Sequence, residues 1–338
     1  MKIFDSAYLK ELGVVDVGYT EVAEVSIDSR LRFNEWIESK KNGDLKFLSE
    51  SGRRTTLENI KNYFPQFQSA LVFLFSYKSF KKIFDDYYYC NDDSNNEKST
   101  FKIASFALAF EGFDYHIYLR EKLQLLALKL KEKGKISLDA SPVMEKDLAY
   151  RAGLGFFGKN SLLINPQHGS YFIIGALLLS EKLSEKISEK IPRFLSEGCG
   201  DCTLCMDACP VGAIDNDRVI DARKCLSALT VEKCHNHNHN HNHNNHVEHN
   251  CQRMIFGCEI CQEVCPYNNH NSLSSASPFS FYYNSYPKIK LITDWFLESD
   301  MEKFEALKKM SNNQFRKLFK DTSFERVGRV KMIKNMSN

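Results

Sequence analysis

The stretch C-G-D-C-T-L-C-M-D-A-C-P, residues 199–210, decides how this chain is interpreted. Its cysteines, Cys199, Cys202, Cys205 and Cys209, have the spacing C-x2-C-x2-C-x3-C-P of bacterial ferredoxins. In that motif three thiolates hold one [4Fe-4S] cluster and the fourth cysteine reaches a different cluster. Structural zinc sites use paired C-x-x-C units without the trailing C-P, so the spacing favours iron-sulfur over zinc.

A second cysteine run, G-C-E-I-C-Q-E-V-C-P, occupies residues 257–266. Two-cluster ferredoxins exchange the last cysteine of each run between the clusters. This exchange predicts that the first cluster is held by four cysteines, Cys199, Cys202, Cys205 and Cys265. The second cluster would use Cys209, Cys258 and Cys261, and it needs one further ligand.

Three cysteines could complete the second cluster. Cys225 lies in the well-formed segment D-A-R-K-C-L-S-A-L-T-V-E, whereas Cys234 and Cys251 flank a nearly pure His-Asn repeat at 235–249. Such a repeat cannot form a core, so a ligand beside it would be held poorly. We therefore predict Cys225. The repeat could bind divalent metals adventitiously, but an exposed insertion without a metal role is the simpler interpretation.

Composition points to a reducing compartment. Ten of the eleven cysteines fall between Cys199 and Cys265, and such clustering indicates metal binding rather than disulfides. The start of the chain lacks a secretory pattern, and apolar runs such as 171–179 are too short to cross a bilayer. We expect a cytoplasmic protein without membrane contact. The formal net charge of +2 argues neither for nor against a polyanionic partner.

The residues before the cysteine runs predict a separate domain. Apolar residues recur at three and four over 111–133, which predicts an amphipathic helix, and the apolar runs at 69–77 and 171–180 predict buried strands. The result is an α/β or α+β domain. A ferredoxin does not require some 190 preceding residues, so we expect this domain to receive the electrons.

The segment 139–170 contains glycines that resemble a phosphate-binding loop. Gly153, Gly158 and Lys159 give the form G-x-x-x-x-G-K, but Asn160 follows instead of Ser or Thr. The order of the predicted elements is also the reverse of strand, loop and helix. The glycines indicate instead that the backbone passes close to something large and flat.

Several motifs in order resemble the epoxyqueuosine reductase family. They are D-A-S-P at 139–142, A-G-L-G-F-F-G-K-N-S-L-L at 152–163, the two cysteine runs and the segment around Cys225. The resemblance covers about residues 100–268 and implies reduction of the epoxide of epoxyqueuosine at the wobble position of tRNA to queuosine. It implies an oxidoreductase with cobalamin and two [4Fe-4S] clusters.

The resemblance also implies an organisation in three parts. We expect an α+β fold with an N-terminal α/β cobalamin-binding domain at 1–190 and a bacterial ferredoxin-like domain at 191–270, which carries the insertion. A short helical and basic segment would follow at 271–338. From residue 301 onward it has ten Lys or Arg and four Asp or Glu, which could attract tRNA or form a solvated helical face.

By the same resemblance, Asp139 would touch the cofactor and donate the proton. The alternative is a helix N-cap before Pro142 and Glu145. A proton donor at neutral pH needs a raised pKa, which burial beside the corrin could produce. The motif F-D-Y-H at 113–116 also fits the family, although a packed helix start explains it as well.

Further cofactor contacts are implied in the same way. Those in the loop after Asp139 would cradle the corrin: Lys159, Asn160 and Leu163. Those near the second cluster would place it against the cofactor edge: Ser227, Cys258 and Glu259. In S-G-R-R-T-T, Arg54 matches a family arginine near the cofactor, and Arg53 competes with it.

The expected partners are the tRNA anticodon stem-loop and an external electron donor such as a flavodoxin or ferredoxin, and we expect a monomer. Two other functions compete. A reductive dehalogenase uses the same pair of cofactors but is usually exported. A non-catalytic iron-sulfur carrier or scaffold would bind no cobalamin.

Overall fold

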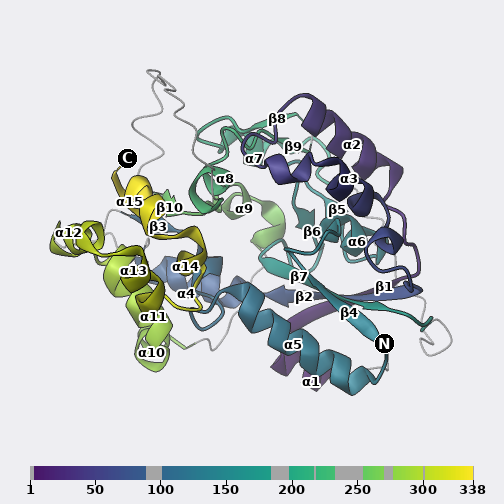
Figure 1. Ribbon diagram of the computed structural model, residues 1–338, viewed down its shortest axis with the longest axis horizontal. Coiled ribbons are helices and arrows are strands. Elements are labelled where there is room, and N and C mark those ends of the chain that lie inside the picture. The colour runs from purple at the N-terminus through teal and green to yellow at the C-terminus, as the bar shows by residue number, and fades with distance from the viewer. Residues whose placement is uncertain are drawn as a thin grey trace.

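The computed structural model describes residues 4–88, 101–183, 198–216, 218–232, 254–269, 277–299 and 301–337. The insertion at 235–249, Cys234 and Cys251 lie outside these ranges. An antiparallel sheet with the strand order β1-β2-β7-β4 forms the centre of the N-terminal part (Figure 1). Its strands are β1 (Val14–Thr20), β2 (Ser69–Ser76), β4 (Gly134–Leu138) and β7 (Phe172–Leu179).

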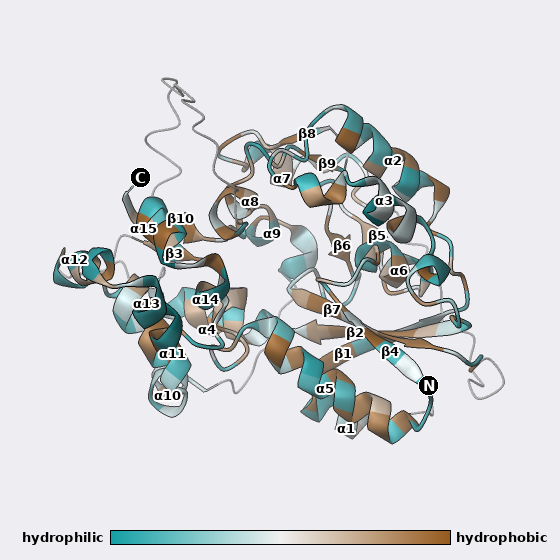
Figure 2. Cartoon of the chain, in the orientation of Figure 1, coloured by the Kyte–Doolittle hydropathy of each residue, from teal (hydrophilic) through white to brown (hydrophobic). Residues whose placement is uncertain are grey.

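The two predicted strands are confirmed as the inner strands of this sheet. Strand β2 pairs with β1 and β7, and β7 pairs with β2 and β4. Helices cover both faces, so β2 and β7 are apolar along almost their whole length instead of alternating with polar residues (Figure 2).

The two faces of strand β2 belong to two different cores. Leu71, Phe73 and Phe75 pack with residues of helix α5 (Tyr115–Leu130), and α1 (Ser6–Glu11) lies on the same side (Figure 1). Ala70, Val72 and Leu74 point the other way and pack against α6 (Glu145–Arg151). Helices α2 (Ile27–Glu38) and α3 (Ser51–Glu58) lie on this second side.

Helix α5 confirms the predicted helix within 111–133. Asp114 is its N-cap and accepts a hydrogen bond from the amide of His116, which satisfies an otherwise unpaired helical donor. The helix ends at Lys131, whose backbone adopts the left-handed conformation with φ 59°. Its beginning therefore places Asp114, Tyr115 and His116 beside the end of β4.

The cysteine region consists of short elements above the sheet (Figure 1). It contains α7 (Leu204–Asp207), α8 (Leu226–Val231), α9 (Ile260–Glu263) and the hairpin of β8 (Ile214–Asn216) and β9 (Val219–Ile220). A second hairpin, β5 (Phe156–Phe157) and β6 (Leu163–Ile164), connects it to the sheet. Strand β10 (Met254–Phe256) pairs in parallel with β3 (Lys102–Ile103).

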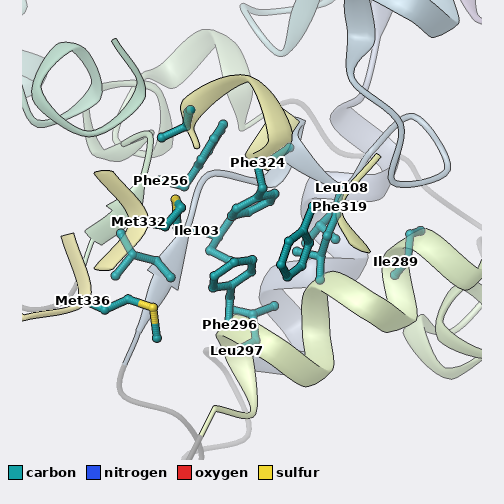
Figure 3. Close-up of a cluster of buried hydrophobic side chains, with 14 of the residues drawn as sticks. Ile103, Leu108, Phe256, Ile289, Phe296, Leu297, Phe319, Phe324, Met332 and Met336 are labelled. Atoms are coloured by element: carbon teal, nitrogen blue, oxygen red, sulfur yellow. The ribbon is translucent and has the colours of Figure 1, made fainter. Parts of the chain in front are cut away.

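The C-terminal segment is helical, as predicted. Its elements are α10 (Phe279–Ser285), α11 (Pro287–Ile292), a π-helical turn (Thr293–Leu297), α12 (Met301–Lys309), α13 (Asn312–Leu318), α14 (Ser323–Val327) and α15 (Arg329–Ser337). They surround a core of phenylalanines, in which Phe296 stacks on Phe324 with ring centres 4.5 Å apart (Figure 3). Helix α4 (Lys78–Tyr88) contributes Phe80 and Phe84 to this core.

The predicted α+β class holds, with one correction to the N-terminal part. Its sheet is antiparallel, so this part is α+β rather than α/β. The boundaries at 190 and 270 stay predictions. One core joins Phe80, Ile103, Phe256 and the C-terminal helices, so residues of all three predicted parts pack together. Among the described helices, none combines the length and apolarity needed to cross a membrane.

Candidate cofactor and active site

The two cysteine runs fold into loops of the same conformation. Thr203 precedes helix α7 with φ −120° and ψ 4°, and Glu259 precedes α9 with φ −122° and ψ 7°. The last cysteine of each run donates its amide back to the helix, Cys209 to Met206 at 3.3 Å and Cys265 to Gln262 at 3.1 Å. The internal repeat of the sequence is therefore also a repeat of structure, which suits a two-cluster module.

The described cysteines are free thiols that fall into two electrostatic groups. Burial raises the pKa of Cys205 to about 11, and the neighbouring thiols that add to the rise are Cys199, Cys265 and Cys202. Burial likewise raises the pKa of Cys258 to about 11, and Cys225 and Cys209 add to it. In the predicted ligand sets, these sulfur atoms would bind iron as thiolates.

The two groups adjoin each other. Burial raises the pKa of Cys261, and its neighbours include Cys258 and Cys225 of its own group but also Cys205 of the other. Among the described residues, no three His, Cys, Asp or Glu converge tightly enough for one metal ion. Cys225 lies with the second group, whereas Cys234 and Cys251 are outside the described ranges, so the choice of the last ligand stays a prediction.

Buried hydrogen bonds fix the second cysteine loop to the sheet domain. Ser170, which precedes β7, donates its hydroxyl to Gln262 of α9 at 2.9 Å and its amide to Asn268 at 2.8 Å. Gly169 comes so close that a Cβ there would stand 2.0 Å from the amide oxygen of Asn268. These contacts fix the second cysteine loop to the end of the loop that leads into β7.

A cavity of about 680 Å³ opens between the second cysteine group and the sheet. Its walls are chiefly apolar and include Leu163, Phe172 and Ile174, while Cys225 lies in its lining. Trp36 of α2 closes one side by donating its indole N–H to the carbonyl of Ile220 at 2.7 Å. A wide apolar space beside a cluster ligand suits a flat organic cofactor.

A second cavity, of about 690 Å³, is lined mainly by charged side chains. Its lining includes Asp114 and His116 from the start of α5 and Arg316 and Arg326 from the C-terminal segment. Asp139 lines both cavities. Its side chain is 52% exposed because it opens into these spaces.

Asp139 is held by two neighbours on helix α5. His116 Nε2 lies 2.9 Å from Oδ2 of Asp139, and the hydroxyl of Tyr115 donates to the same oxygen. Asp139 itself follows β4 with φ 44°, in the left-handed region that non-glycine residues rarely adopt. The N-cap of α6 is Met144 rather than Asp139, so the alternative role as helix cap finds no support among the described residues.

The expected rise of the Asp139 pKa is wrong for this structure. Burial acts to raise the pKa, but hydrogen bonds from His116 and Tyr115 and the nearby Arg326 guanidinium hold it below its ordinary value. The opposite shift occurs at His116. Burial alone would lower its pKa, yet the carboxylates of Asp114 and Asp139 raise it to about 9. At neutral pH the proton therefore resides on the imidazole.

The three residues predicted to cradle the corrin lie in different surroundings. Leu163 lines the apolar cavity, but Lys159 and Asn160 are not part of its lining. Asn160 is buried and donates to the carbonyl of Cys261 at 3.4 Å. Gly155 and Gly158 approach Ile164 of their own hairpin, so their close packing serves the hairpin rather than a cofactor.

The other predicted contacts also lie outside the apolar cavity. The Glu259 carboxylate is buried, accepts a hydrogen bond from the amide of Ser105 at 2.8 Å and lies 3.7 Å from Lys81. Glu259 is not in the lining of the apolar cavity. Neither Cys258 nor Ser227 is in its lining, although Ala228 is. Arg54 donates to Asn34 at 2.6 Å, whereas the competing Arg53 lines the charged cavity.

Sequence reasoning missed Asp114, His116 and Arg326 as members of the site. The motif F-D-Y-H was a usable signal for the first two. No sequence motif pointed to Arg326, because the residue that it contacts, Asp114, lies 212 positions earlier in the chain.

Two family models match the chain. One, described as a 4Fe-4S double cluster binding domain, matches residues 198–268, and one described as epoxyqueuosine reductase QueG matches residues 58–142. The epoxyqueuosine reductase of Cyclobacterium marinum is 33% identical over 245 residues, which is 71% of this chain and 69% of that protein. That of Leadbetterella byssophila is 36% identical over 239 residues, 68% of each chain.

Solved structures of epoxyqueuosine reductases are also similar to this chain. The crystal structure of an epoxyqueuosine reductase with an epoxyqueuosine-modified tRNA-Tyr stem loop matches with a TM-score of 0.68 and 25% identity, over 98% of this chain and 78% of that chain. The epoxyqueuosine reductase of Streptococcus thermophilus, 23% identical with a TM-score of 0.69, shows the same fold.

A double-cluster module packed beside a large apolar cavity, with Cys225 in the cavity wall, is the arrangement of an iron-sulfur oxidoreductase that passes electrons through a second cofactor. Within that class the particular family follows from the matched sequences: the chain belongs to the epoxyqueuosine reductase family. Its cofactors are two [4Fe-4S] clusters and cobalamin. The predicted family and enzyme class are confirmed, and the non-catalytic electron carrier is not supported.

Proposed function

We propose that this protein reduces the epoxide of epoxyqueuosine in tRNA to queuosine, and that Asp139 is the residue that meets the substrate oxygen. One observation carries the assignment of Asp139: its carboxylate lines both the apolar and the charged cavity. The epoxide must reach reduced cofactor on one side and a proton source on the other, and Asp139 lies where the two spaces meet.

The reaction converts an epoxide, two electrons and two protons into an alkene and water. Cobalamin, when bound, supplies the reduced cobalt that transfers electrons to the substrate. Leu163, Phe172 and Ile174 would pack on the corrin from the sheet side, and Trp36 would pack from α2. Cys225 in the same wall would bring the second cluster within reach of the cofactor. Asp139 would hand a proton to the oxygen that leaves.

The charged cavity would receive the modified nucleoside. Arg316 lines it, and the exposed Lys317 and Lys320 follow in or near helix α13. Positive charge beside the entrance attracts the phosphates on either side of the wobble base. The relative solved with a modified tRNA stem loop supports this kind of partner.

We infer that the enzyme works in the cytoplasm as a monomer. Its electron donor would be a flavodoxin or a ferredoxin. A donor would reach the first cysteine group, since Leu204 between Cys202 and Cys205 is 47% exposed.

Anaerobic reconstitution with iron, sulfide and cobalamin tests the function. The loaded protein, a chemical reductant and a tRNA stem loop bearing epoxyqueuosine should yield queuosine in the digested nucleosides. Protein that carries both clusters and cobalamin but leaves epoxyqueuosine unchanged at every pH would refute the proposal.

A further inference from the structure

A chain of three side chains crosses the charged cavity at the start of helix α5. His116 Nδ1 lies 2.7 Å from Oδ1 of Asp114, and its Nε2 lies 2.9 Å from Oδ2 of Asp139. Both ring nitrogens thus face carboxylate oxygens, and the ring stacks on Tyr115 with centres 4.2 Å apart. An imidazole between two carboxylates fits best when it carries both protons, because each nitrogen can then donate.

The C-terminal segment fixes the far end of this chain. Arg326 of α14 places Nε 3.3 Å from Oδ2 of Asp114, and the amide of Asp114 donates to the carbonyl of Asp321 at 2.8 Å. Asp114 is 5% exposed, so its geometry is set by these contacts and by its role as N-cap of α5. The imidazole is therefore oriented from one side by a rigid carboxylate and left free to exchange its proton with Asp139.

The titratable and charged groups around His116 come from several elements. Its near neighbours are Asp114 at the start of α5, Tyr115 on α5, Asp139 after β4, Glu145 on α6, Glu232 after α8 and Arg326 on α14. Arg53, Arg316, Asp321 and Glu325 line the same cavity. Carboxyl groups outnumber guanidinium groups in this set, and the two nearest, Asp114 and Asp139, favour the charged imidazole. Its pKa of about 9 and the lowered pKa of Asp139 follow from this arrangement.

We propose that His116 is a positioning residue that holds the proton which Asp139 delivers to the leaving oxygen, with Asp114 and Arg326 fixing its ring. The inference rests on the proposed function. One proton passes from Nε2–H of His116 to the Asp139 carboxylate and from Asp139 to the leaving oxygen, so the pair loses one proton in all. The neutral ring then takes a proton from water and supplies the second one, while both electrons arrive through the clusters.

The test is the pH dependence of kcat/KM of the holoenzyme on an epoxyqueuosine stem loop. In the wild type the rate should fall as pH rises through about 9, where His116 loses its proton. His116→Gln keeps a donor toward Asp139 but no exchangeable charge. It should lower kcat roughly 100-fold with little change in KM, and move the alkaline limb to lower pH.

Asp114→Asn provides a second variant that retains a good N-cap. It removes the charge that stabilises the imidazolium, so the alkaline limb should move to lower pH even if His116→Gln folds poorly. His168→Gln is the control, since His168 lines neither cavity. If the wild type is active and both variants keep its alkaline limb, His116 does not hold the proton. If the wild type is inactive at every pH, the proposed function itself fails.

Discussion

At the scale of single residues, the position of Asp139 depends on an unusual backbone conformation. With φ 44° it costs conformational energy that the surrounding contacts must offset. Tyr115 and His116 supply those contacts, and both bind the oxygen Oδ2. The strained turn after β4 thus directs one carboxylate to the boundary of two cavities.

We expect Asp139→Asn to lower turnover by about 100-fold or more, because an amide cannot pass on a proton. Cobalamin should remain bound, since the apolar walls of its cavity are unchanged. The measurement is queuosine formation together with the cobalamin absorbance of the purified variant. Full turnover in a variant that retains cobalamin would remove Asp139 from the mechanism.

At the scale of elements, the second cluster needs a ligand from outside both cysteine runs, and Cys225 is the predicted one. Cys225 precedes α8 and lies in the wall of the apolar cavity. Cys225 is a near neighbour of the thiols of both Cys258 and Cys261. As the predicted fourth ligand, it would bring the second cluster and the cofactor to the same place.

We expect Cys225→Ser to lose one cluster and keep the other, so the iron content of the reconstituted protein should fall by half. Cys234→Ser and Cys251→Ser are matched controls that should retain all their iron. The iron content of each variant and the spectrum of its reduced clusters show how many clusters it holds. Loss of a cluster in a control but not in Cys225→Ser would assign the ligand to that control position.

Helices α4 and α9 are joined by a buried cation. Lys81, 4% exposed, lies 2.8 Å from Glu263, 3.7 Å from Glu259 and 2.6 Å from Asp85. Burial alone would lower its pKa, but the three carboxylates raise it, so the ammonium stays charged. The contact ties the second cysteine loop to the helix that leads into the phenylalanine core.

Removing this cation should be costly. Lys81→Met leaves the buried Glu259 carboxylate without its partner, and we expect the free energy of unfolding to fall by about 3 kcal/mol. Lys82→Met, which breaks only the exposed pair with Asp86, should change it by less than about 1 kcal/mol. Urea unfolding of the two variants under identical cluster loading compares them, and equal midpoints would show that Lys81 contributes no stability.

At the scale of the whole molecule, the C-terminal helices form one wall of the charged cavity. Their phenylalanine core includes Ile103 and Phe256, which belong to paired strands of the two preceding parts (Figure 3). The same segment carries Arg316 and Arg326 to the charged cavity. In the proposed function, substrate binding would therefore depend on the stability of this core.

We expect Lys317→Glu combined with Lys320→Glu to weaken binding of the stem loop and to reduce the dependence of log affinity on log salt by about two. Turnover at saturating substrate should change little. Lys10→Glu, on α1, is the control, since Lys10 is not in the lining of the charged cavity. Unchanged affinity and salt dependence would place the tRNA backbone elsewhere.

The sequence by itself determined the chemistry of the cofactors and the main elements. Cysteine spacing within a loop is a local constraint, and apolar periodicity reports burial, so both can be read without coordinates. The motifs around Asp139 and Cys225 were recognisable for the same reason, because each is a short contiguous string.

Only the tertiary structure decided how these pieces act together. It made the sheet antiparallel, left Glu259 out of the wall of the apolar cavity and placed Arg326 beside Asp114. It also lowered the pKa of Asp139 and raised that of His116, so His116 and not Asp139 carries the proton at neutral pH. A pKa depends on which charges surround a group in space. Those neighbours come from segments far apart in the chain, and no local pattern encodes their distances.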